Sequence, residues 1–205
     1  MNMDMLGEIA DLSLEHLILV LISIMIAAGL AIPGAIALTR RAGLRRGVLA
    51  FVNILQTIPS LALFGFLIPI PFIGGIGKRT AIVALIAYAL LPILRNTLIG
   101  ITGVDPGVRE SAVAMGMTDR QVLWQVEIPL AAPSILAGLR VATVTTIGTA
   151  TLAAAIGGGG LGVFIFRGIA SVDSAQILSG AIPAALMAIL ADEGLGWIER
   201  KFARG

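Results

Sequence analysis

The sequence predicts an all-α membrane protein, a polytopic helical bundle of about five transmembrane helices, with the N-terminus outside and the C-terminus in the cytoplasm. Three observations favour this fold class. Charged residues make up only 13% of the 205 residues and the mean hydropathy is +1.01, whereas a soluble domain carries roughly 25% charge. The apolar residues form continuous runs rather than an alternating pattern, which favours helices over a barrel. Lys and Arg gather in short clusters between these runs, as they do in loops beside a membrane.

Five apolar stretches reach or approach the ~20 residues that a helix needs to cross about 30 Å of hydrocarbon. The first begins after Glu15, and the fifth is the shortest. Pro59, Pro92 and Pro183 interrupt the second, third and fifth stretches, and each proline removes a backbone hydrogen bond and is expected to bend its helix. We expect one transmembrane domain, residues 1–205, with spans at 17–38, 48–70, 81–100, 133–155 and 177–191.

The basic residues predict the orientation, because cytoplasmic loops carry the excess of Lys and Arg. With the N-terminus outside, ten of the 14 Lys and Arg fall on the cytoplasmic side, three fall outside, and Arg140 lies within the fourth span. The acidic N-terminal stretch also suits the outer side. The cytoplasmic ten are Arg40, Arg41, Arg45, Arg46, Arg95, Arg109, Arg120, Arg200, Lys201 and Arg204; the outer three are Lys78, Arg79 and Arg167.

The residue types exclude several chemistries. Without cysteine the chain cannot form disulfides or thiolate metal sites, and its one histidine, His16, cannot build a zinc site alone. No HExxH motif, paired carboxylates or nucleophile–base pattern lies within a span, which argues against a membrane enzyme. The pI near 9.7 is compatible with nucleic-acid binding, but the basic residues sit in short clusters between apolar runs, which argues against it. We therefore expect no catalytic residue, no metal, no cofactor held by this chain and no nucleic-acid partner.

Two glycine-containing segments are only superficially similar to nucleotide-binding motifs. Gly157–Gly162 satisfies GxGxxG, but an apolar span precedes it where a strand belongs, and Asp173 follows too soon. Residues 77–80 read Gly-Lys-Arg-Thr, with Arg79 where a phosphate loop needs Ser or Thr for magnesium. We interpret the first segment as a flexible turn on the outer side, and we expect no ATP hydrolysis by this chain.

The longest polar stretch, residues 102–129, is predicted to form two short helices at the cytoplasmic surface. Asp105, which is followed by proline, reads as the N-cap of the first helix. Gly116 is expected to end that helix, and Thr118 begins a capping box that Gln121 completes.

The second short helix is expected to end near Glu127, before Pro129. An alternative for the whole stretch is an amphipathic helix that lies on the bilayer surface. On the first helix we expect an apolar face made by Val108, Ala112 and Met115. In the loop as a whole we expect Arg109, Glu110 and Asp119 to remain available to a partner.

From Glu110 the loop reads Glu-Ser-Ala, three residues, Gly116, nine residues, Val126, one residue, Ile128-Pro129. This pattern resembles the EAA signature of ATP-binding-cassette importer permeases: Glu-Ala-Ala, three residues, Gly, nine residues, Ile, one residue, Leu-Pro. The three departures keep size or apolarity. The resemblance implies the type I importer permease fold and a loop that docks on a separate ATPase subunit, which holds the ATP and magnesium. The residues that it places at this contact are Glu110, Ser111, Ala112, Met115, Gly116, Asp119 and Pro129.

The resemblance extends over roughly residues 50–170. The osmoprotectant branch, which imports glycine betaine, carnitine and choline, is similar to this chain in segments 53–63, 91–97, 103–106, 145–152 and 157–162. Methionine permeases share the loop but are less similar in the second span, so an amino-acid importer of the same superfamily is the alternative; a self-contained channel or secondary transporter is a more distant one. The resemblance implies the cytoplasmic membrane of a bacterium or archaeon. The implied partners are the ATPase, a second permease copy or paralogue, an extracytoplasmic binding protein and membrane lipid.

Polar side chains within the spans are candidates to line a translocation pathway. Each could instead hydrogen-bond within the bundle, and Arg140 could extend to the cytoplasmic surface rather than face a water-filled path. Trp124, Trp197 and Tyr88 are too few and too scattered for the aromatic cage that holds a quaternary ammonium ion, so we expect the high-affinity site on the binding protein. The candidates are Asn53, Gln56, Thr57, Ser60, Arg140, Thr143, Thr145, Thr146 and Thr149.

Overall fold

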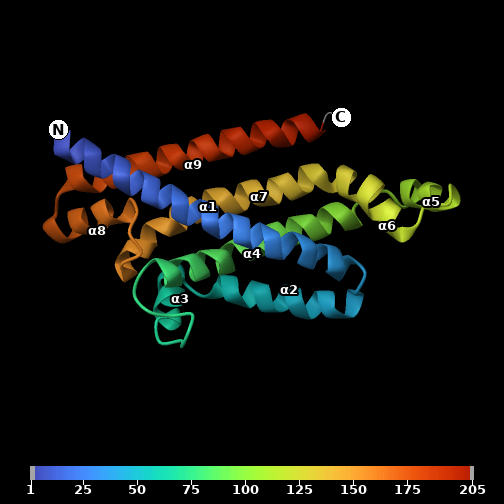
Figure 1. The fold of residues 1–205 in the computed structure, drawn as a ribbon, viewed down its shortest axis with the longest axis horizontal. Helices are drawn as coiled ribbons and strands as arrows, with labels where there is room; N and C mark the ends of the chain where they lie inside the picture. Colours follow the sequence, from blue (N-terminus) through green and yellow to red (C-terminus); the bar gives the residue numbers. More distant parts are fainter. Residues whose placement is uncertain (1–2, 204–205) are drawn as a thin grey trace.

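The structure, a computed structural model, describes residues 3–203, so Arg204 of the cytoplasmic set lies outside the described residues. Within residues 3–203 every regular element is helical, which confirms the all-α prediction (Figure 1). In chain order the elements are α1 (Met3–Thr39), α2 (Ala42–Thr57), α3 (Ser60–Leu67), α4 (Lys78–Thr102), α5 (Pro106–Ala114), α6 (Asp119–Val122), the π-helix η1 (Leu123–Glu127), α7 (Ile128–Ala150), the 3-10 helix η2 (Thr151–Ile156), α8 (Gly162–Ser171) and α9 (Ser174–Ala203).

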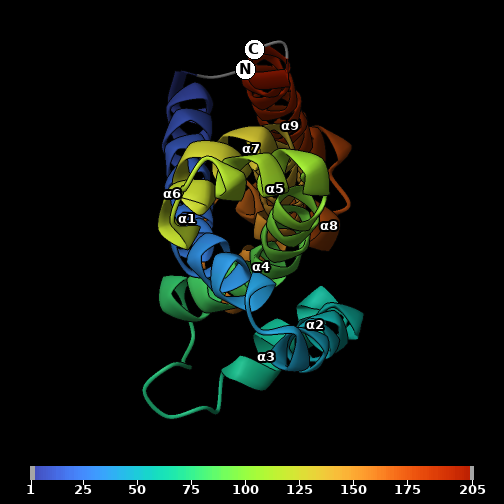
Figure 2. The same cartoon turned by 90° about the vertical axis from the view of Figure 1, so that its right-hand side faces the viewer.

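The core of the bundle is formed by α1, α4 and α7, which pack side by side along most of their lengths (Figure 1). Helix α9 packs on α7 and α8, while α2 and α3 lie to one side of the core (Figure 2). Small side chains predominate where the three core helices meet, and they allow the close backbone approach by which helices associate in lipid. The fully buried alanines of these helices are Ala27, Ala31 and Ala35 of α1, Ala81, Ala84 and Ala89 of α4, and Ala131, Ala142 and Ala150 of α7.

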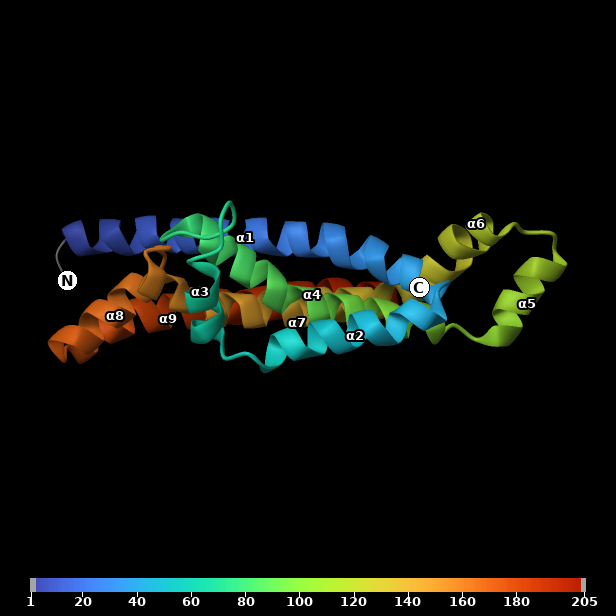
Figure 3. The ribbon, with the colours of Figure 1, turned by 90° about the horizontal axis from the view of Figure 1, so that it is seen from below.

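The two ends of the bundle differ in what they carry. The start of α1 and the whole of α8 lie at one end, whereas α5 and α6 project beyond the helices at the other (Figure 3). Helix α9 ends on the half of the molecule that carries α5 and α6 (Figure 1). This arrangement is that of a chain with an odd number of crossings.

In the part of the chain that the structure describes, four helices are long and apolar enough to cross a membrane, and a bent pair raises the number to five if it counts as one crossing. The fifth crossing was expected to be short and interrupted at Pro183, but α9 runs unbroken from Ser174 to Ala203. Prolines are tolerated in membrane helices because neighbouring groups satisfy the freed backbone atoms. The long helices also pass beyond the predicted spans, since bilayer thickness limits a span and not the helix that contains it.

The second predicted span, 48–70, bends at Pro59 as expected, and the bend divides the span into two separate helices. Helices α2 and α3 meet at an angle of 100° around Ile58 and Pro59. Ile58 is extended, with ψ of 126°, because a residue that precedes proline is pushed out of the α region. The Tyr88 hydroxyl of α4 donates to the Ile58 carbonyl at this break, so the bend is held from outside as well as by the proline.

The second short helix of the 102–129 stretch does not end before Pro129, as had been expected. Helix α6 continues through η1 and α7 into η2, and the four elements form one continuous helix from Asp119 to Ile156. In η1 the Ile128 N–H donates to the Leu123 carbonyl, five residues back. This wider turn lets the helix pass the proline, whose missing N–H would otherwise interrupt an α-helix.

Candidate functional site: the cytoplasmic loop and the polar groove

The loop that carries the signature is built from two capped helices. The Asp105 carboxylate accepts the Gly107 N–H at 2.7 Å at the start of α5. Gly116 follows α5 with φ of +83°, a conformation that favours glycine. Thr118 and Gln121 form a reciprocal capping box at the start of α6. These three features confirm the local structure that the sequence predicts.

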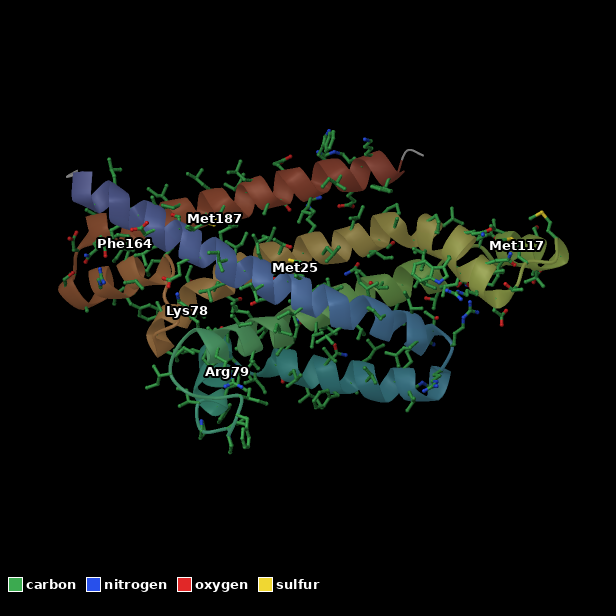
Figure 4. All side chains as sticks on the ribbon, in the orientation of Figure 1. Met25, Lys78, Arg79, Met117, Phe164 and Met187 are labelled. Atoms are coloured by element: carbon green, nitrogen blue, oxygen red, sulfur yellow. The ribbon has the colours of Figure 1, made fainter. Side chains whose placement is uncertain are left out.

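Helix α5 turns its larger apolar side chains outward. Val108 is 44% exposed and Met115 76% exposed, whereas Ala112 is 2% exposed. The expected common apolar face of these three was therefore wrong, because only the small alanine packs inward. Glu110, Ser111, Gly116 and Asp119 are exposed beside them. Met117 marks the far end of this loop in Figure 4, and the loop offers an exposed surface of mixed polar and apolar character. Pro129 is likewise exposed, at the start of α7.

Arg109 was expected to face a partner, but it points inward to a buried carboxylate. Its Nε lies 2.7 Å from Oε1 of Glu127, and Nη2 of Arg40 lies 3.0 Å from the other carboxylate oxygen. Glu127 is only 1% exposed. We call Arg40, Arg109 and Glu127 the Glu127 clamp. Sequence reasoning missed it because Glu127 occupies the variable position of the signature, and its partners come from distant parts of the chain.

A polar groove of about 440 Å³ lies between α2, α4 and α7. Three of the predicted pathway residues, Gln56, Thr145 and Thr149, line it. Sequence reasoning did not place Tyr88, Arg95 or Asn96 there, because only the packing of α4 against α7 shows which face of α4 is open. The remaining lining residues are Leu91, Pro92 and Val141.

The hydrogen bonds in the groove leave mainly acceptors free. Gln56 donates its amide to the Tyr88 carbonyl at 2.9 Å, and Asn96 donates to the Pro92 carbonyl at 2.8 Å. Thr145 and Thr149 donate to carbonyls of their own helix. The amide and hydroxyl oxygens therefore remain as acceptors beside the exposed guanidinium of Arg95, so the groove suits a small polar solute.

The other predicted pathway residues do not line this groove. Asn53 and Thr57 are exposed elsewhere on α2, and Ser60 begins α3. Thr143 donates to the Leu139 carbonyl within α7 at 2.8 Å. Thr146 is buried in the core at 1% exposure. The structure thus brings together only part of the predicted set.

Arg140 was expected either to extend to the cytoplasmic surface or to face a water-filled path. In the structure it pairs with two acidic residues instead. Its Nε and Nη2 bond both carboxylate oxygens of Asp192 at 2.6 and 2.7 Å, and its Nη1 lies 3.4 Å from Glu199. Both acids come from α9. A second hollow of about 350 Å³ surrounds these charges, and Val141 and Thr145 line both hollows. Arg140 therefore joins α7 to α9 beside the groove.

The glycine run at the opposite end is a packed turn and not the flexible one expected. Gly157, Gly159 and Gly160 have φ between +74° and +80°. The Gly160 N–H donates to the Glu15 carboxylate at 2.8 Å, and Lys78 pairs with the same carboxylate at 2.5 Å. A Cβ on Gly159 would lie 2.3 Å from a Glu15 oxygen. The glycines serve close packing between α1 and this turn, at the end that Lys78 marks in Figure 4.

The chain resembles known transport proteins over nearly its whole length. The model of the family described as "binding-protein-dependent transport system inner membrane component" matches residues 20–204. The glycine betaine/carnitine/choline transport system permease protein OpuCB of Bacillus subtilis (strain 168) is 47% identical over 195 residues, 95% of this chain and 88% of that protein. The osmoprotectant import permease protein OsmW of Salmonella typhimurium is 41% identical over 192 residues, 93% of this chain and 89% of that protein.

Among solved structures, an inward-facing conformation of the MetNI methionine ABC transporter matches with a TM-score of 0.88 at 24% identity. The match covers 98% of this chain and 99% of that one. At this identity the likeness concerns the fold, and it confirms the predicted type I importer permease architecture.

Proposed function

The chain belongs to the family of binding-protein-dependent transport system inner membrane components, and from this premise we propose that it is the membrane-spanning permease subunit of an ATP-binding-cassette importer for an osmoprotectant. The solute class is that of glycine betaine, carnitine and choline. The name of OpuCB, at 47% identity, refers to all three compounds. ATP hydrolysis belongs to a separate ATPase subunit, and this chain supplies the path through the membrane.

The observation that carries the proposal is the loop formed by α5 and α6. It projects beyond the bundle, both of its helices are capped, and its apolar side chains point outward. A loop without a partner gains nothing by exposing Val108, Val113 and Met115. A separate ATPase subunit would cover this surface, with Glu110, Ser111 and Asp119 at the polar edge of the contact.

The groove between α2, α4 and α7 is the best-supported stretch of the translocation path. It holds acceptor oxygens, one exposed guanidinium and one tyrosine, which is enough to replace part of a solute's water shell without binding it tightly. A permease needs such weak contacts because the solute must leave again. Two permease subunits, either two copies or one copy with a paralogue, would enclose this path, and an extracytoplasmic binding protein would deliver the solute.

The second candidate is an importer of methionine or a related amino acid. The fold of the methionine transporter matches closely, at a TM-score of 0.88. However, identity to the osmoprotectant permeases is about twice as high, 47% against 24%. The solute set of the experiment therefore includes methionine.

The proposal is tested in proteoliposomes that hold the chain with its ATPase and its substrate-binding protein. We expect ATP-dependent uptake of radiolabelled glycine betaine, carnitine or choline, and no uptake when the ATPase is omitted. Uptake of methionine alone would transfer the chain to the second candidate. Uptake that needs neither ATP nor the ATPase would show a self-contained carrier and overturn the proposal.

A further inference from the structure

Four elements of the cytoplasmic end meet at one carboxylate. Glu127 ends η1, just before α7, and pairs with Arg40, which directly follows α1. It also pairs with Arg109 of α5, whose Nη2 in turn donates to the Ile101 carbonyl in the last turn of α4 at 3.3 Å. A carboxylate that is 1% exposed is stable as an ion only when it is paired and hydrogen-bonded. The Glu127 clamp therefore links the ends of α1 and α4, the helix α5 and the start of α7.

Little else holds α5 to the rest of the molecule. Ala112 is its one buried side chain, and an alanine offers a small apolar contact area. Short connections lead from α4 into α5 at residues 103–105 and from α5 into α6 at residues 115–118. The ion pair of Arg109 with Glu127, together with its hydrogen bond to the Ile101 carbonyl, is accordingly the main side-chain tether between α5 and the bundle.

The position of Glu127 depends on the π turn. In η1 the chain gains one residue per turn relative to an α-helix, which rotates the residues that follow about the helix axis. Glu127 is the last residue of η1 and is buried, while its neighbours Gln125 and Pro129 are exposed. Such π turns are frequent at functional sites.

We propose that Glu127 is the positioning residue that transmits motion of the ATPase-docked loop to the transmembrane helices. The inference rests on the proposed function. Because the clamp ties α5 to α1, α4 and α7 at once, a displacement of α5 moves the cytoplasmic ends of all three together. Without the carboxylate, Arg40 and Arg109 face each other unpaired, and α5 moves while the helices stay behind.

The experiment compares Glu127→Gln with the parent chain in the assembled transporter. Glutamine keeps the size of the side chain and removes its charge. We expect Glu127→Gln to retain the ATPase subunit, because the docking surface is untouched, but to hydrolyse several-fold more ATP per solute imported. Glu193→Gln, on an exposed carboxylate of α9, is the matched control and should keep the parent ratio.

A spectroscopic readout separates coupling from transport. The chain has no cysteine, so spin labels at Met115→Cys and Leu130→Cys, both exposed positions, report the distance from α5 to α7 without background labelling. We expect a narrow distance distribution in the parent chain and a broad one with Glu127→Gln. This distance measurement needs neither solute nor ATPase. It therefore still tests whether Glu127 holds α5 against α7, even if the parent chain imports no osmolyte and the proposed function is wrong.

An unchanged ratio of ATP to solute, or an unchanged distance distribution, overturns the inference. A proportional loss of ATPase binding, hydrolysis and uptake also overturns it, because a purely structural residue behaves in that way. If Glu127→Gln does not assemble, Arg109→Gln is used instead, because it removes the ion pair between α5 and Glu127 and leaves the pair with Arg40 in place. The same ratio of ATP to solute and the same distance distribution are then measured.

Discussion

Gly116 occupies the turn between α5 and α6 with φ of +83°, and a Cβ built on it meets no atom within 4 Å. A side chain at this position would therefore strain the backbone but would not clash with any neighbouring atom. For a residue other than glycine the left-handed conformation costs about 1–2 kcal/mol, and asparagine tolerates it better than most.

We therefore predict that Gly116→Val destabilises the turn by about 1–2 kcal/mol and weakens ATPase binding, because α6 is no longer held in register with α5. Gly116→Asn is the matched control and should stay close to the parent. Co-purification yield of the ATPase with each variant is the measurement. Equal yields for valine and asparagine would contradict the role of the backbone conformation.

At the residue scale the sequence predicts what depends on neighbours along the chain. The N-cap at Asp105, the glycine turn and the capping box at Thr118 are set within four residues and were predicted correctly. The pairing of Glu127 with Arg40 spans 87 residues, and no local pattern contains it. For the same reason Arg140 could not be assigned its partners on α9.

At the scale of elements, the sequence predicts a bend at Pro59 but not the extent of the break between α2 and α3. A proline alone bends a helix modestly, whereas this pair turns by 100°. The difference comes from α4, because Tyr88 donates its hydroxyl to the Ile58 carbonyl that the break leaves free. A tertiary hydrogen bond of this kind has no signal in the sequence of the broken segment.

We predict that Tyr88→Phe destabilises the break by about 1–2 kcal/mol, because the Ile58 carbonyl loses its partner in a half-buried position. The measurement is thermal unfolding of the detergent-purified protein, in which Tyr88→Phe should show a lower midpoint temperature than the parent chain. Thr57→Ala is the control, since the Thr57 hydroxyl donates only to the Ile54 carbonyl of its own turn at 2.7 Å. A drop as large in Thr57→Ala as in Tyr88→Phe would speak against the cross-helix bond.

The contact between α7 and α9 gives a second prediction at this scale. Arg140 bonds Asp192 through two parallel N–H···O contacts and meets Glu199 through one longer contact. Bidentate pairs have stricter geometry and greater strength. Asp192→Asn should therefore loosen α9 more than Glu199→Gln does, as measured by protease cleavage at the α8–α9 turn. The reverse order would show that the longer contact matters more.

At the scale of the whole molecule, the number of crossings and their order could be predicted, because hydropathy and span length depend on composition alone. The exact helix ends could not, since α9 passes both Pro183 and the acidic residues near 192 without a break. The groove was predicted only in part. Which polar residues meet there depends on how α2, α4 and α7 pack, and periodicity within one helix does not fix its rotation against its neighbours.

The two ends of the bundle set the last prediction. Helix α9, at 30 residues, is about 45 Å long at ~1.5 Å per residue, which is more than the ~30 Å of hydrocarbon requires. It leads from the α8 end to the end that carries α5. The turn at Ser171 and the loop at Met115 should therefore lie on opposite sides of the membrane, the first outside and the second in the cytoplasm, as the distribution of Lys and Arg predicts.

We predict that Ser171→Cys in intact cells reacts with a membrane-impermeant maleimide, whereas Met115→Cys reacts only after permeabilisation. Both side chains are exposed, and the chain contributes no other thiol, so each signal reports one site. For this labelling the chain is expressed without the ATPase subunit, because the ATPase would cover Met115. Reaction of Met115→Cys in intact cells would invert the orientation. It would place α5 and α6 where no ATPase can reach them, and the loop could then not couple ATP hydrolysis to transport.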